Sequence, residues 1–128
     1  MILLLDTSTP TCRLTLVEGE HHFAYEWEAN RELAKGLLEW LQKRLEEQGK
    51  TWQDLTGIGA FTGPGSFTGL RIGLTVLNTH ADSLDIPIVG ANGDDWQQAA
   101  FNRLNNGETD RITLPYYGSE ANITTPRK

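Results

Sequence analysis

The sequence predicts a single α/β domain in which three helices cover a mixed five-stranded sheet. Residues 12–17 and 21–27 alternate between apolar and polar side chains, as strands do. Residues 30–48 and 66–84 instead repeat their apolar positions with the period of a helix. A run of strands followed by alternating strands and helices gives the element order β-β-β-α-β-α-β-α, which is typical of a mixed sheet.

The first strand is expected over residues 2–5, where a continuous apolar run ends in the polar turn at residues 6–9. Such a run is typical of a strand buried on both faces. Glu18-Gly19-Glu20 predicts a hairpin turn between the next two strands. Since consecutive strands with short connections pair antiparallel, we expect the first strand at the centre of the sheet. The later strands, at 57–61 and 87–90, are then added in parallel by right-handed crossovers.

The first long helix is expected to begin after Asn30, a favourable N-cap, and to end before Gly49. The second carries an apolar seam, and a seam of this kind usually faces another helix. Its residues follow one another in steps of three and four: Phe67, Leu70, Leu74, Leu77, Ala81 and Leu84. Gly69 and Gly73 lie off the seam and would let a backbone approach closely. A third, shorter helix is expected over residues 96–104, then one further strand at 112–117 and a polar tail.

Composition excludes several classes of protein. Lys and Arg number 11 against 17 Asp and Glu, a net charge of −6, whereas binding of nucleic acid depends on cationic side chains. Cys12 is the only cysteine, so an intramolecular disulfide and a cysteine-rich metal site are excluded. No segment resembles an export signal or approaches the roughly 20 apolar residues of a transmembrane helix. We therefore expect a cytoplasmic protein with no membrane contact that does not bind nucleic acid unaided.

The most informative local segment is Gly63-Pro64-Gly65-Ser66-Phe67-Thr68-Gly69. It stands between a predicted strand and a helix N-terminus, where backbone N–H groups and the helix dipole favour an anion. Its glycine spacing differs from that of dinucleotide and Walker A loops, and no Lys-Ser or Lys-Thr pair follows. The structural alternative is a tight turn with Ser66 capping the helix. Arg71 either reaches a bound anion or covers apolar neighbours.

The other candidate residues indicate neither a catalytic nor a metal site. Asp6 stands in a turn, where an Asx-turn is its commoner role, and no base is placed to activate Ser8. His21 and His22 point to opposite faces of a strand, and His80 has no ligand-forming neighbour at helical spacing. We expect no metal ion and no other cofactor.

Residues 60–73, which contain Gly63-Pro64-Gly65-Ser66-Phe67-Thr68-Gly69-Leu70-Arg71, closely resemble the TsaB family of accessory proteins in bacterial tRNA threonylcarbamoyladenosine biosynthesis. Residues 2–9 and the helix after Glu32 resemble the same family in the same order, so the resemblance covers approximately residues 1–90. It implies a single actin-like ATPase (ribonuclease H-like) lobe over residues 1–104.

The resemblance also implies a scaffold rather than an enzyme, one that pairs with the TsaD-type transferase that modifies adenosine 37 of tRNA. Transferases of that type carry a His-x-x-x-His metal motif after the fifth strand, where this chain has Gly90-Ala91-Asn92-Gly93-Asp94. Pairing is implied through a bundle of the two long helices, with tRNA reached only through the complex and a TsaE-type ATPase as a further partner. The expected interface residues are Leu33, Leu37, Leu41, Leu45, Leu70, Leu74, Leu77, Ala81 and Leu84.

The length of the chain departs from the family pattern. With 128 residues it is too short for the two lobes of family members, and residues 105–128 resemble a remnant of the C-terminal segment followed by a polar tail. One wall of the nucleotide cleft of actin-like ATPases would then be missing, so we expect no ATP binding by the chain alone. Without its partner, the apolar seam predicts a homodimer. The alternative function is a small nucleotide-binding or hydrolysing protein that uses Asp6 and residues 63–69.

Overall fold

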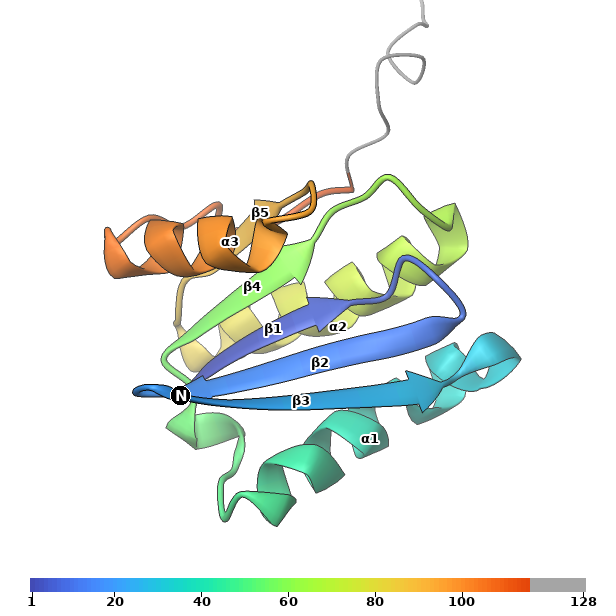
Figure 1. The fold of residues 1–128 in the computed structure, drawn as a ribbon, viewed down its shortest axis with the longest axis horizontal. Coiled ribbons are helices and arrows are strands. Elements are labelled where there is room, and N and C mark those ends of the chain that lie inside the picture. The colour runs from blue at the N-terminus through green and yellow to red at the C-terminus, as the bar shows by residue number, and fades with distance from the viewer. Residues whose placement is uncertain (116–128) are drawn as a thin grey trace, which may run out of the picture.

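A mixed five-stranded sheet forms the centre of the molecule (Figure 1). The computed structural model describes residues 1–115, and its strands are β1 (Ile2–Asp6), β2 (Thr11–Glu18), β3 (His21–Glu28), β4 (Gly57–Phe61) and β5 (Ile88–Ala91). They lie in the order β3-β2-β1-β4-β5, with β1 antiparallel to β2 and parallel to β4. The predicted α/β class, the element order and the central place of the first strand are confirmed.

Helices cover both faces of the sheet. α1 (Leu33–Glu47) and α2 (Phe67–Leu84) lie on one face, and α3 (Trp96–Asn105) lies on the other (Figure 1).

The predicted N-cap of the first long helix is wrong, because a 3-10 turn at Asn30–Glu32 precedes α1. Asn30 adopts a left-handed backbone (φ 49°) in that turn, and Glu32 takes the N-cap position without a side-chain cap. Within residues 1–115, no helix combines the length and apolar character needed to cross a membrane.

Successive side chains of a strand point to opposite faces of the sheet, so the hydrophobic core has two layers. Leu3 and Leu5 of β1 pack with Leu14 of β2 against the helices α1 and α2. On the other face, Leu4 packs in a second cluster with Trp96 of α3. Both faces of β1 are therefore buried, which explains why its sequence is apolar without interruption.

Residues 107–115, which we call the strap, follow α3 and pass along the outer edge of β5. Thr109 Oγ1 accepts a hydrogen bond from the N–H of Ile88 (3.1 Å), and Asp110 Oδ2 accepts one from the N–H of Gly90 (2.8 Å). The N–H of Asp110 donates to the Ile88 carbonyl (2.7 Å). Arg103 holds Asp110 in place, with 2.6 Å between Arg103 Nη2 and Asp110 Oδ1. The strap therefore satisfies edge groups that would otherwise need another strand.

An amide side chain fastens the end of the strap to α2. Asn78 Nδ2 donates to the Thr113 carbonyl (2.9 Å), and the Thr113 N–H donates to Asn78 Oδ1 (2.8 Å). Because this side chain takes the place of a strand partner, the described part of the predicted strand, residues 112–115, forms no strand. The rest of that strand and the predicted polar tail, residues 116–128, lie outside the described residues.

The ion pair on the strap predicts a pH-dependent stability. Burial raises the pKa of Asp110, but hydrogen bonds from Arg103 and from the Gly90 N–H outweigh burial, so this pKa lies below its usual value. A carboxyl group with a depressed pKa stabilises the folded chain above the unfolded pKa of about 4, and the stabilisation is lost as the pH falls through the folded value. We expect Asp110→Asn to lower the free energy of unfolding by about 1 kcal/mol at pH 7. The difference from the wild type should shrink below about pH 4.

Urea unfolding at neutral and at acidic pH measures both effects. Glu39→Gln is the matched control, because Glu39 makes an exposed pair with Lys43 on α1 and should change stability by only a few tenths of a kcal/mol. An equal loss of stability at both pH values for Asp110→Asn would contradict the role assigned to its charge.

Candidate functional site

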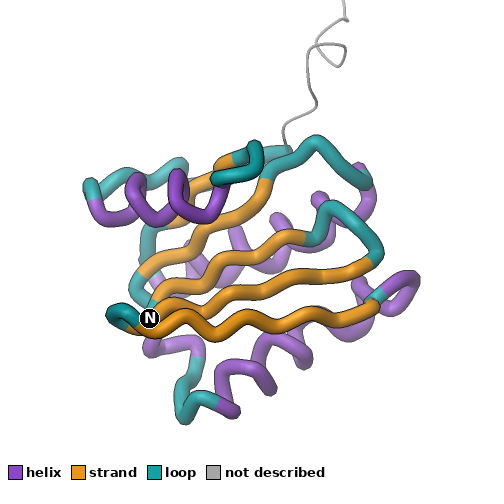
Figure 2. Tube along the Cα trace, viewed as in Figure 1, coloured by secondary structure: helices purple, strands orange, loops and turns teal. Residues whose placement is uncertain are grey.

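The glycine-rich segment at residues 63–69 lies beside the turn after β1 at one end of the sheet (Figure 2). β1 and β4 are parallel neighbours, so the turn at residues 7–10 and the loop at residues 62–66 leave the same edge. Three polar side chains at this end of the sheet are buried, with exposed fractions of 3–7%: Thr7, Ser8 and Thr62. We call the contact between the β1–β2 turn and the start of α2 the joint.

Two hydrogen bonds cross the joint, and a third shapes the turn. The N–H of Ser66 donates to the Ser8 carbonyl (2.8 Å), and the Thr7 hydroxyl donates to the Gly69 carbonyl (2.7 Å). Within the turn, the N–H of Ser8 donates to Asp6 Oδ1 (2.8 Å). Asp6 therefore forms an Asx-turn, and its carboxylate shapes the segment that packs on α2.

Glycine is required where α2 meets the turn. A Cβ on Gly69 would overlap the Thr7 carbonyl oxygen, and a Cβ on Gly65 would overlap Ser8. One helical turn beyond Gly69, a Cβ on Gly73 would overlap the Thr7 side chain. Each approach lies well inside 3.0 Å, which real Cβ atoms essentially never show. The prediction that a backbone comes close is confirmed at Gly69, where that backbone belongs to the turn, whereas at Gly73 the close neighbour is the Thr7 side chain.

Two backbone N–H groups at the start of α2 are bonded within the chain. Ser66 Oγ accepts the Gly69 N–H (3.1 Å), which confirms the predicted cap, while the Ser66 N–H is bonded to Ser8. N–H groups at this position are the ones that hold a phosphate in a glycine-rich loop. Their engagement favours the tight turn over the anion site. Arg71 fits the same interpretation, because its guanidinium carbon lies 5.1 Å from the centre of the Phe67 ring.

The remaining reactive side chains offer little chemistry. Burial, with a smaller contribution from the charge of Asp6, raises the pKa of the Cys12 thiol to about 12. The thiol is therefore protonated at neutral pH, and a protonated thiol is a poor nucleophile. Within residues 1–115, no group of three or more His, Cys, Asp or Glu side chains is placed to hold a metal ion.

The structure corrects the predicted partner interface. An amphipathic helix on a sheet turns its apolar stripe inward, and the seam of α2 packs with α1 and the sheet of the same chain. Leu84 is half-buried. A partner would therefore meet the outward faces of the helices. The other predicted interface side chains are 0–6% exposed: Leu33, Leu37, Leu41, Leu45, Leu70, Leu74, Leu77 and Ala81.

A groove that the sequence analysis missed lies between the starts of α1 and α2, beside the joint. Its volume is about 570 Å³, and it is lined in part by Pro10, Ala34, Thr68 and Ile72. Leu38, one helical turn after Ala34, is 47% exposed. Ala34 and Leu38 are four residues apart, a spacing that indicates one apolar face directed outward. The four buried leucines of α1 form the stronger apolar repeat and conceal it.

Comparison with known proteins gives one matching family model and several similar curated proteins. The family model for TsaD, tRNA N6-adenosine threonylcarbamoyltransferase, matches residues 27–103. Among curated proteins, the chain is similar to the tRNA threonylcarbamoyladenosine biosynthesis protein TsaB of Escherichia coli, with 32% identity over 70% of the chain and 38% of that protein. TsaB of Haemophilus influenzae is 33% identical over 78% of the chain and 43% of that protein. TsaB of Bacillus subtilis is 36% identical over 68% of the chain and 38% of that protein.

The chain thus spans about two fifths of the length of the curated relatives it matches. Among solved structures, YeaZ from Pseudomonas aeruginosa superposes with a TM-score of 0.69 at 28% identity, over 81% of this chain and 49% of YeaZ. A second structure with the same values is described as an uncharacterized protein with similarity to peptidase YEAZ from the same organism.

The effect of replacing a glycine of the joint by alanine depends on what the added Cβ would meet. Gly69→Ala would gain helix propensity, but its Cβ meets backbone that cannot move aside, so we expect a loss of about 2 kcal/mol in the free energy of unfolding. Gly73→Ala meets a side chain instead, and the added change Thr7→Ala should recover part of its loss.

Urea unfolding of the single and double variants measures this coupling. Gly57→Ala is the control, because its Cβ would meet only the flexible end of Leu104, at 3.1 Å. Full additivity of Gly73→Ala and Thr7→Ala, or a Gly69→Ala variant as stable as the wild type, would show that the joint is not tightly packed.

Proposed function

The chain belongs to the TsaB family, and we propose that it serves tRNA threonylcarbamoyladenosine biosynthesis as a non-catalytic subunit that pairs with a TsaD-type transferase. In this proposal the transferase carries out the modification of adenosine 37, and the chain meets tRNA only through the complex. A TsaE-type ATPase is a further proposed partner, and the cytoplasm is the proposed location.

The proposal rests on the exposed apolar surface that α1 and α2 turn outward. The two helices lie on the same face of the sheet (Figure 1), and the groove between their starts offers an apolar surface at Ala34 and Ile72. Leu38 extends this surface along α1 with 47% of its area exposed. An exposed apolar groove between two helices suits the side chains of a partner helix.

The TsaD family model supports the kind of partner. It matches residues 27–103, a range that includes both α1 and α2. A transferase described by the same model is expected to present two corresponding helices. Two such pairs can meet as a four-helix arrangement with approximate two-fold symmetry.

The chemistry of the described residues supports an accessory role. The N–H groups of Ser66 and Gly69 are bonded within the joint, and the Cys12 thiol is protonated at neutral pH. Residues 90–94, which form the end of β5 and the turn after it, hold no histidine with which to bind a metal ion. These features favour a binding subunit over the alternative of a nucleotide-hydrolysing protein that uses Asp6.

A charge on the outward surface should weaken pairing. We expect Leu38→Glu to raise the dissociation constant of the complex with the matching TsaD-type transferase at least about tenfold, because the carboxylate would be buried at the interface. Leu114→Glu is the matched control, since Leu114 is also an exposed leucine (71%) but lies on the strap.

Size-exclusion chromatography and calorimetry of the mixed proteins give the measurement. Elution as one species, with affinity reduced by Leu38→Glu and retained by Leu114→Glu, is the expected result. Failure of the unaltered chain to bind the transferase would sink the proposal. Equal affinity for both variants would move the interface away from α1.

A further inference from the structure

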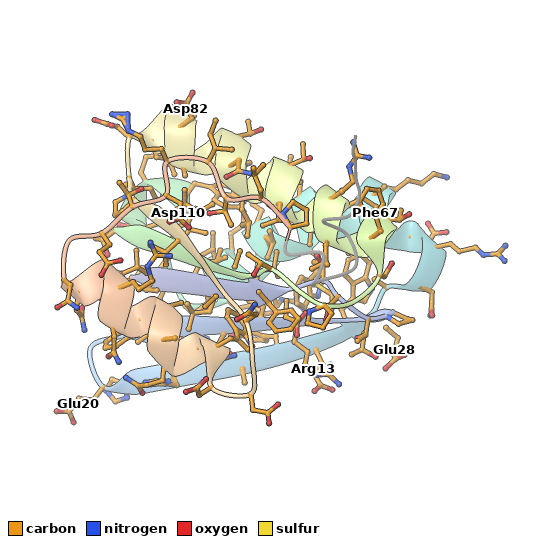
Figure 3. The ribbon with its side chains drawn as sticks, turned by 90° about the horizontal axis from the view of Figure 1, so that it is seen from above. Arg13, Glu20, Glu28, Phe67, Asp82 and Asp110 are labelled. Carbon is orange, nitrogen blue, oxygen red and sulfur yellow. The ribbon has the colours of Figure 1, made fainter. Side chains whose placement is uncertain are left out.

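A second groove, which we call the strap groove, lies between α2 and the strap. Its volume is about 310 Å³. Figure 3 shows Phe67, one of its lining residues, at the start of α2, at the end of the helix opposite Asp82. Leu74 and Thr113 form the floor of the groove, since they are only 4% and 3% exposed. The other lining residues are Phe67, Arg71, Thr75, Asn78, Leu114 and Pro115.

Two large apolar side chains at the rim of the strap groove are exposed to solvent. Leu114 is 71% exposed and Phe67 is 49% exposed. Within residues 1–115 only four large apolar side chains are exposed, and these two line the same groove. Single exposed apolar side chains are common on proteins, whereas a group of them at one place marks an interaction site.

Hydrogen bonds between α2 and the strap hold the groove in shape. The Asn78 side chain donates to the Thr113 carbonyl (2.9 Å) and accepts from the Thr113 N–H (2.8 Å). The Thr113 hydroxyl donates to Asp110 Oδ2 (3.4 Å), which also accepts from Arg103 Nη1 (3.2 Å). A groove whose walls are fixed before binding loses little entropy when a ligand enters.

Arg71 is the only charged residue among those that line the strap groove. Its guanidinium carbon lies over the Phe67 ring, 5.1 Å from the ring centre. Within the described part of the chain, no hydrogen bond or ion pair engages its N–H groups. A guanidinium that lies over a ring keeps the donors at its edge for other partners. Arg71 therefore places a positive charge with unused donors beside an apolar surface.

We propose that the strap groove binds a short segment of a partner protein in which one carboxylate stands beside large apolar side chains. The carboxylate would pair with Arg71, and the apolar side chains would pack against Phe67 and Leu114. The anion would thus be held by a side chain and not by the N–H groups of Ser66 and Gly69, which the joint uses. This goes beyond the proposed function, because the groove assigned there lies on the α1 side of α2.

Charge favours a carboxylate-bearing segment over a nucleic acid. A phosphate backbone is bound by several cationic side chains, whereas the strap groove has one, and the chain has a net charge of −6. A single guanidinium instead matches one carboxylate, which it can hold with two parallel hydrogen bonds. Among the described residues no acidic side chain lines the groove, and exposed charges beyond about 8 Å are largely screened at physiological salt. The groove is therefore locally positive on an acidic chain.

An NMR titration of the full chain at about 0.15 M salt tests the proposal. The probe is an acetylated and amidated peptide in which serine and glycine flank a centre of leucine, glutamate and phenylalanine, so its glutamate is its only charge. The control peptide has glutamine in place of glutamate. We expect shifts at the backbone amides of Arg71, Thr75 and Leu114. The glutamate peptide should bind about tenfold more tightly than the glutamine peptide, because only its carboxylate forms a charge-assisted pair.

Two variants separate the charge from the apolar contacts. Arg71→Gln should bind both peptides equally, with the affinity that the unaltered chain has for the glutamine peptide. Leu114→Ser should weaken the binding of both peptides and keep the tenfold ratio between them. Lys43→Gln is the matched control, because Lys43 is also an exposed cation but pairs with Glu39 on α1 (3.2 Å), and it should change neither dissociation constant. The replaced side chains are exposed, so circular dichroism should show the native fold for each variant.

Several results would overturn the proposal. These are the absence of binding up to millimolar peptide, equal affinity of the unaltered chain for both peptides, and a tenfold preference that persists in Arg71→Gln. Shifts confined to the amides of Ala34 and Ile72 would place the peptide in the other groove and would also contradict the proposal. Tighter binding of a uridine oligonucleotide than of the glutamate peptide would assign the strap groove to nucleic acid instead. None of these results depends on whether the chain pairs with the transferase.

Discussion

The carbonyl group of Thr7 stands where a side chain on Gly69 would stand, and the arrangement of the chain around the β1–β2 turn depends on this approach. Because the turn directly follows the central strand β1, the contact fixes the start of α2 relative to the middle of the sheet. The Thr7 hydroxyl and the Ser8 carbonyl then complete the hydrogen bonds at the start of the helix. A glycine-rich sequence at a helix N-terminus serves here to receive backbone, and that use competes with holding an anion.

The same contact accounts for the surface that we assign to a partner. With α2 docked through its glycines, the apolar seam turns toward the sheet and α1, and the predicted interface leucines become core. What remains outward is the groove beside Ala34 and Ile72, with Leu38 beyond it.

Periodicity was enough to predict the α/β class, the order of the elements and the central place of β1, because each element buries a face whose repeat is visible in the sequence. The Ser66 cap and the close approach at Gly69 and Gly73 were also predictable from residue type. What the apolar seam of α2 faces was not predictable, because a helix with one apolar face has the same sequence pattern whether its own sheet or another chain covers that face. The strap was missed because its contacts join single side chains, such as Asn78, to distant backbone and leave no repeat.

We interpret the glycine-rich segment as a packed joint rather than a phosphate site. The most direct measurement is an NMR titration of the chain with ATP and Mg²⁺, followed at the backbone amides of Ser66 and Gly69. Since both N–H groups are already bonded within the chain, we expect no saturable shift of these signals up to millimolar nucleotide. A saturable shift that is lost in a Ser66→Ala variant would contradict it and would restore the nucleotide-binding alternative.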